Sequence, residues 1–169
     1  MTALILLLSP VLASAQTSVA LLDYKAVVPA GWTSKTPSSD MRLAEFVVPS
    51  PAGKADVVVY FFGSGRGGDI DANLERWRGQ FSSPDGKPVY EKTTSETVGA
   101  ISLTIAEFRG TYDRGMGTGG NGEAARPNNT LLAVIAETAA GTMYFQLFGD
   151  SKAVDAARDA YMTFVRSLK

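Results

Sequence analysis

The chain has 169 residues and contains no histidine and no cysteine, which excludes Ser-His-Asp and Cys-His catalysis and zinc sites built from these residues. Its 16 basic and 17 acidic residues give a net charge of −1. This near-neutral balance provides no strong electrostatic attraction to nucleic acid or to an anionic membrane surface, so we expect neither as a partner.

The first 15 residues have the features of a signal peptide. An uncharged apolar run ends at Ala13-Ser14-Ala15, a small-x-small pattern typical of signal-peptidase sites, although no lysine or arginine precedes the run. We expect cleavage after Ala15, export to the periplasm or the extracellular space, and no membrane insertion afterwards, because no later segment is long enough to span a bilayer. Residues 16–169 then form a single domain that is large enough to bury a core without disulfides.

Four extended segments are predicted in the first half of this domain. Residues 19–28 are rich in β-forming side chains and end at a proline-glycine turn, after which Trp32 begins a further extended piece. Residues 41–48 place side chains alternately on two faces. Residues 57–62 are apolar throughout, as in a central strand covered on both sides.

A glycine-rich turn then leads into a helix that the apolar spacing predicts over residues 70–81. Gly63, Gly65 and Gly68 match the G-x-G-x-x-G spacing of dinucleotide sites, which hold pyrophosphate at a bare helix N-terminus. Asp69 and Asp71 would occupy that N-terminus and repel the pyrophosphate. We therefore interpret the glycines as a tight turn and the aspartates as helix-capping acids. One side of the helix carries an apolar stripe, formed by Ile70, Leu74, Trp77 and Phe81.

The second half is predicted to contain a hairpin and two further strands. The hairpin joins residues 89–98 to residues 101–109, and a long loop with six glycines follows at 110–129. Residues 131–137 and 143–148 are apolar strands whose short connection indicates antiparallel neighbours.

A C-terminal helix over residues 153–168, capped by Asp150 or Ser151, completes the predicted elements. The fold class that follows is α+β, with a mostly antiparallel sheet of about six strands, one mid-chain helix and one C-terminal helix.

Polar residues on one side of the mid-chain helix are the candidate binding site. Asn73, Arg76 and Gln80 form a row beside the apolar stripe, and Arg66 lies in the turn before the helix. We expect this row to hydrogen-bond the backbone of adjoining loops, with Arg76 pairing a carboxylate of the sheet. Trp77 belongs to the buried stripe, so we expect it in the core and not stacked on a nucleic-acid base.

No catalytic residue and no metal or cofactor site is expected from the sequence. One alternative is a carboxylate-dependent hydrolase or carbohydrate-active protein, in which two strand carboxylates converge on one pocket. The residues that could supply such a pair are Glu45, Asp56, Glu107 and Glu137.

Four segments resemble a family of uncharacterised exported bacterial proteins with the PsbP-like fold of photosystem II extrinsic proteins. They are Val28-Pro29-Ala30-Gly31-Trp32, Met41-Arg42, the glycine turn with Asn73-x-x-Arg76-Trp77-x-x-Gln80-Phe81, and Tyr144-Phe145-x-Leu147-x-Gly149. The resemblance implies an α/β/α sandwich with an antiparallel sheet, and it implies no catalytic residues. The function expected from the sequence is therefore an exported, non-enzymatic binding or accessory domain whose partner is an unknown protein or small ligand.

Overall fold

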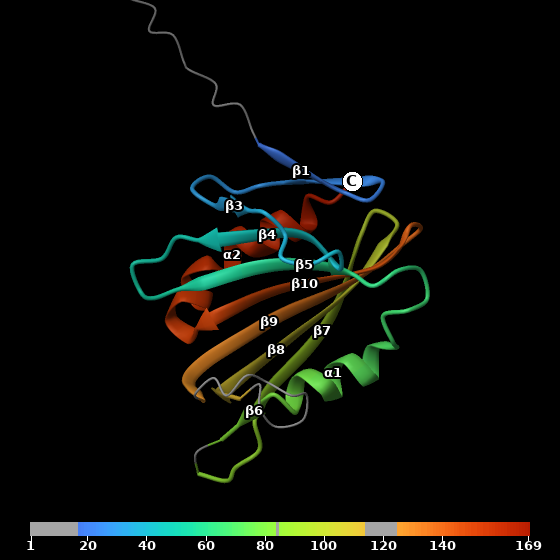
Figure 1. The fold of residues 1–169 in the computed structure, drawn as a ribbon. Coiled ribbons are helices and arrows are strands. Elements are labelled where there is room, and N and C mark those ends of the chain that lie inside the picture. Colours follow the sequence, from blue (N-terminus) through green and yellow to red (C-terminus); the bar gives the residue numbers. More distant parts are fainter. Residues whose placement is uncertain (1–16, 84, 114–124) are drawn as a thin grey trace, which may run out of the picture.

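The computed structural model describes residues 17–83, 85–113 and 125–169, and within them it contains two helices and two sheets (Figure 1). The predicted signal peptide and most of the predicted glycine-rich loop lie outside these residues. The helices are α1 (Ile70–Arg78) and α2 (Ser151–Arg166). No helix in the described ranges is long and apolar enough to cross a membrane.

The main sheet has eight strands among the described residues, and all of its pairs are antiparallel. The strand order is β3-β4-β5-β10-β9-β8-β6, and β7 also pairs with β8. The strands are β3 (Thr33–Lys35), β4 (Arg42–Val48), β5 (Ala55–Phe61), β6 (Phe81–Ser82), β7 (Tyr90–Val98), β8 (Ile101–Tyr112), β9 (Arg126–Thr138) and β10 (Gly141–Asp150).

The prediction of about six strands was too low. Short strands such as β3 and β6 have too few residues to show a period, and they are strands because a neighbouring strand pairs with their backbone. The expected strand at 19–28 is instead a separate hairpin of β1 (Ser18–Leu21) and β2 (Tyr24–Val27). Its turn includes Leu22 at a positive φ of 57°.

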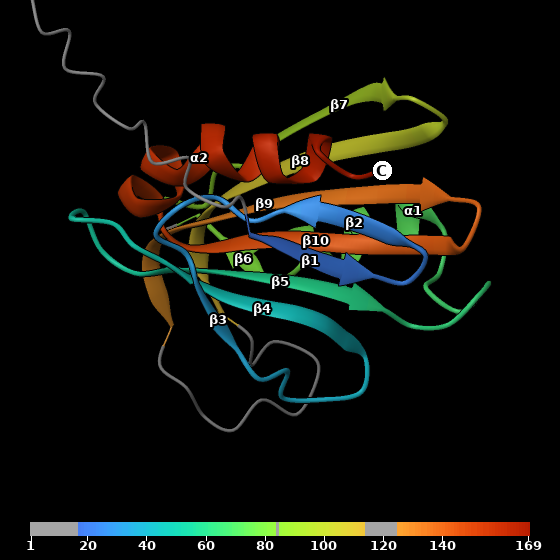
Figure 2. The same ribbon diagram turned by 90° about the horizontal axis from the view of Figure 1, so that it is seen from above.

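Each helix covers one face of the sheet, as the two views show (Figures 1 and 2). Alternation along β9 places Leu132, Val134 and Ala136 in the core that includes α2. The intervening Leu131, Ala133 and Ile135 belong to a second core that includes Trp77 of α1. The main sheet therefore lies between the two helices.

The sequence predicted the helix caps and the apolar stripe of α1 correctly. Asp69 caps α1 by accepting a hydrogen bond from the backbone N–H of Ala72, and Asp150 caps α2 by accepting one from Lys152. Helix α1 ends at Arg78, three residues before the predicted end, and Phe81 reaches the same core from β6.

Candidate functional site

The glycine-rich turn before α1 is a tightly packed corner. Gly63, Gly65 and Gly68 have φ values of 95°, 69° and 75°, a backbone conformation that side chains other than glycine rarely adopt. A Cβ atom added to Gly67 would lie 1.8 Å from the hydroxyl oxygen of Tyr144 on β10. Conformation and close packing therefore account for these glycines, as we predicted for the turn.

Asn73 ties α1 back to this turn. Its side chain is buried, and its Nδ2 donates hydrogen bonds of 2.8 Å to the carbonyl oxygens of Gly67 and Asp69. Its Oδ1 accepts a hydrogen bond from Nη2 of Arg76. The expectation that the polar row binds loop backbone is thus met by Asn73.

The expected ion pair of Arg76 with a sheet carboxylate is wrong: within the described residues, Arg76 contacts no carboxylate closely enough for an ion pair. Two strand carboxylates line the groove near Arg76, and both already have basic partners. The Nζ of Lys35 lies 3.1 Å from Oδ1 of Asp56, and Nη1 of Arg42 lies 3.1 Å from Oε1 of Glu45.

A groove of about 490 Å³ runs beside α1, over the part of the sheet formed by β4, β5 and β10. The helix packs on the neighbouring core residues of β8 and β9 and leaves this part of the face open. Basic, acidic, amide and aromatic side chains all line the groove. They include Lys35, Arg42, Arg76, Arg126, Glu45, Asp56, Gln80, Gln146, Tyr60, Phe62, Trp77, Tyr112 and Phe148.

Two pairs of aromatic rings line the groove. Tyr60 and Phe62 are stacked at 5.8 Å between ring centroids, with their planes 11° apart. Tyr112 and Phe148 lie 4.4 Å apart. The guanidinium of Arg42 lies 5.3 Å from the ring centroid of Tyr60, within the range of a cation–π contact. The groove thus combines ring faces with positive charge.

Glu45 is held in its ionised form. Burial would raise the pKa of its carboxyl group, but hydrogen bonds from Ser38 and Arg42 outweigh burial and lower that pKa. Both the backbone N–H and the hydroxyl of Ser38 donate to Oε1, at 2.6 and 2.8 Å. A carboxylate with this environment is a poor proton donor near neutral pH.

The structure brings three of the four predicted site residues together and leaves Arg66 apart. Arg76 and Gln80 line the groove, whereas Asn73 is buried behind Arg76. Arg66 is exposed in the glycine turn and is not a lining residue of the groove. Lys35, Arg42 and Arg126 were not predicted from the sequence, because they lie on β3, β4 and β9, and only the packing of these strands beside α1 brings them to one groove.

The four candidate carboxylates lie in three places. Glu45 and Asp56 face the groove from neighbouring strands, in diagonal positions of the register, where Cα atoms lie roughly 7–8 Å apart. Glu107 pairs with Leu132 and faces α2, while Glu137 lies near the start of α1, beside Asp69 and Asp71. Residues 17–83, 85–113 and 125–169 contain no group of three or more acidic side chains placed to hold a metal ion.

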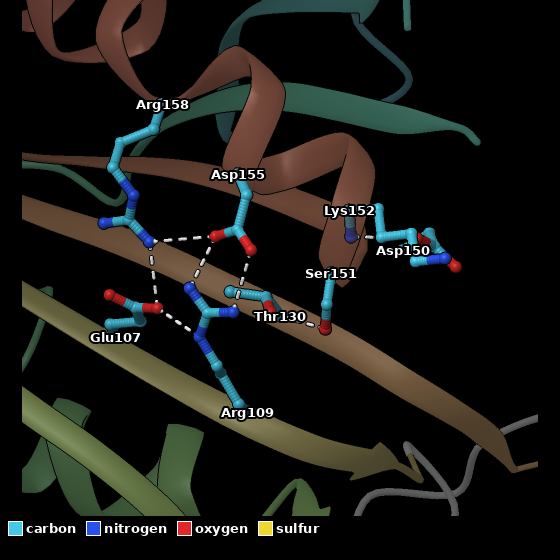
Figure 3. A network of polar contacts seen from close by, with 8 residues as sticks. All are labelled: Glu107, Arg109, Thr130, Asp150, Ser151, Lys152, Asp155 and Arg158. Atoms are coloured by element: carbon cyan, nitrogen blue, oxygen red, sulfur yellow. Dashed lines mark hydrogen bonds and ion pairs between the residues drawn. The ribbon is translucent and has the colours of Figure 1, made fainter. Parts of the chain in front are cut away.

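A second polar cluster lies on the opposite face, between β8 and α2 (Figure 3). Arg109 forms two hydrogen bonds with the carboxylate of Asp155, at 3.0 and 2.5 Å, and Arg158 lies 2.9 Å from the buried Glu107. Two acidic and two basic side chains thus pair with one another. We interpret this cluster as a clamp that holds α2 on the sheet.

No protein-family model matches this chain, and no curated protein matches it in sequence. Two solved structures have a similar fold. One is cyanobacterial PsbP from Synechocystis sp. PCC 6803, at a TM-score of 0.57 and 12% identity, covering 97% of this chain and 98% of that one. The other is PA94 of Pseudomonas aeruginosa, a protein of unknown function, at a TM-score of 0.53 and 14% identity, covering 92% of this chain and 97% of that one. At these identities the likeness establishes a PsbP-like fold alone.

Proposed function

We propose that this chain is an exported, non-enzymatic binding or accessory domain whose ligand or partner docks in the groove beside α1. The observation that carries the proposal is the lining of the groove, in which four basic side chains and two pairs of aromatic rings surround two carboxylates that are already ion-paired. A volume of about 490 Å³ is within the range of small-ligand sites.

Export and family membership belong to the same proposal. The small-x-small pattern at Ala13-Ser14-Ala15 supports cleavage after Ala15, and the PsbP-like fold supports the resemblance to exported bacterial proteins of this type. The near-neutral charge of the chain favours a protein or small-molecule partner over nucleic acid.

A carboxylate-dependent hydrolase is the second candidate, because Glu45 and Asp56 face the same groove. Glycoside hydrolysis needs one carboxylic acid whose pKa is raised so that it can protonate the leaving group. Burial alone would raise the pKa of Glu45, but its hydrogen bonds with Ser38 and Arg42 lower it overall, and Asp56 pairs with Lys35. Binding without catalysis is therefore the better account.

Native mass spectrometry of the protein recovered from its own cell envelope tests the proposal. We expect a chain that begins at Gln16 and carries an added mass that denaturation removes. Gln146→Trp fills the groove and should abolish the added mass, whereas Thr93→Trp, on the exposed strand β7, should retain it. A bare wild-type chain, or an added mass that Gln146→Trp retains, would overturn the groove as the binding site.

A further inference from the structure

We propose that the groove binds an organic anion, with an oxyanion of the ligand on Arg76 and a flat apolar body against the aromatic rings. This inference rests on the proposed binding function and adds the chemical class of the ligand.

The charge balance of the groove leaves it positive. Its two carboxylates are matched one to one with basic side chains, since Lys35 pairs with Asp56 and Arg42 with Glu45. Arg76 adds a further positive charge to the lining, and its side chain contacts the neutral amide of Asn73. The groove therefore attracts a ligand that carries a negative charge and repels a cationic ligand.

Arg76 is held by a neutral partner. Its Nη2 donates to Oδ1 of Asn73, and Asn73 is itself fixed by two hydrogen bonds to the carbonyls of the glycine turn. This contact orients the guanidinium without neutralising it. A guanidinium has five N–H donors in a fixed planar arrangement, so several remain to bind a carboxylate, phosphate or sulfonate group of a ligand.

The aromatic rings favour a flat apolar body on the same ligand. Tyr60 and Phe62 are partly exposed and line the groove, and the buried Trp77, which follows Arg76 in α1, lies at its wall. Burying one ring of a ligand against such a surface removes apolar area from water, and ring pairs add further stabilisation. The two features together specify an anion with an aromatic or similarly flat body.

Fluorescence titration with two dyes tests this ligand class. Anilinonaphthalene sulfonate has a flat aromatic body with one anionic group, and phenylnaphthylamine has a similar body with no charge. We expect saturable binding of the sulfonate at one site, with an affinity about tenfold or more above that of the neutral dye and a decline as salt increases.

Arg76→Gln should weaken binding of the sulfonate about tenfold and leave binding of the neutral dye unchanged, because the variant removes the charge and keeps an amide donor. The matched control is Arg78→Gln, in the same helix, since Arg78 pairs with Glu91 outside the groove. Circular dichroism and the melting temperature confirm that both variants are folded.

The outcomes separate this inference from the proposed function. If the two dyes bind with equal affinity and Gln146→Trp abolishes the binding of both, the groove remains a binding site but its preference for an anion is contradicted. Sulfonate binding that Arg76→Gln and Arg78→Gln weaken equally would also overturn the assignment to Arg76. If neither dye binds in the groove, both the ligand class and the groove itself are contradicted.

Discussion

Two tyrosines of the core differ in how their hydroxyl groups are satisfied. Tyr144 is buried on the α1 face, and its hydroxyl donates to the carbonyl oxygen of Gly68 at 3.4 Å. Tyr161 of α2 is fully buried on the other face, and its hydroxyl has no hydrogen-bond partner within the described part of the chain. A buried hydroxyl without a partner costs free energy on folding, because it loses its hydrogen bonds to water.

Tyr161→Phe should therefore leave the free energy of unfolding unchanged or raise it by up to about 1 kcal/mol, since it removes only the unpaired hydroxyl. Urea denaturation of the purified domain measures the change. Tyr144→Phe is the matched control, and it should be destabilising because it removes a hydroxyl that has a partner. Equal losses in the two variants would show that the Tyr161 hydroxyl does form a hydrogen bond in solution.

Helix α2 and strand β8 are joined by the clamp shown in Figure 3. Asp155 accepts hydrogen bonds from Arg109, and these hold the pKa of its carboxyl group below the ordinary value. Arg109 also contacts Glu107, which is buried beneath the helix. The clamp thus connects an exposed residue of the helix to a buried residue of the sheet.

Asp155→Asn should lower the free energy of unfolding by about 0.5–1 kcal/mol, the range for a well-oriented pair that is partly exposed. Thermal or urea denaturation measures the loss, which should shrink at high salt because the pair is screened. Asp159→Asn, an exposed position on the same helix, controls for the loss of one negative charge. An equal loss in that control would mean that the ion pairs of the clamp contribute no stability beyond the effect of one negative charge on the helix.

For the molecule as a whole, the ion pairs predict how stability depends on pH. Hydrogen bonds from Arg78, Arg166 and Arg109 lower the pKa values of Glu91, Glu96 and Asp155. A carboxylate whose pKa is lowered in the folded state stabilises the fold above its unfolded pKa, about 4, and this contribution is lost as pH falls through the folded value.

We expect the melting temperature to be nearly constant between about pH 6 and 8, because the chain has no histidine to titrate there, and to fall below about pH 4. Differential scanning calorimetry from pH 8 to pH 3 measures this profile. A step in the melting temperature between pH 6 and 7, or a rise in it on acidification, would contradict the role given to these ion-paired carboxylates.

How far the sequence predicted the fold and the site depends on the range of each interaction. The caps Asp69 and Asp150, the stripe that includes Trp77, and the hairpin of β7 and β8 were predicted because short-range periodicity and capping chemistry determine them. Strand β6 escaped prediction because it has only two residues and pairs with β8, beyond the next strand in the chain. Strand β3 lies in the extended piece that was expected from Trp32, but its three residues are too few to show a period.

The sequence by itself determined the two helices, the long antiparallel strands, and a chemistry without histidine or cysteine. It also showed that the glycine spacing before α1 belongs to a turn, because Asp69 follows it directly. Only the tertiary structure decided that Arg76 shares a groove with Lys35 and Arg42 and pairs with Asn73 instead of a sheet carboxylate. The physical reason is that strand order, which sets these neighbours, depends on pairing between segments far apart in the chain.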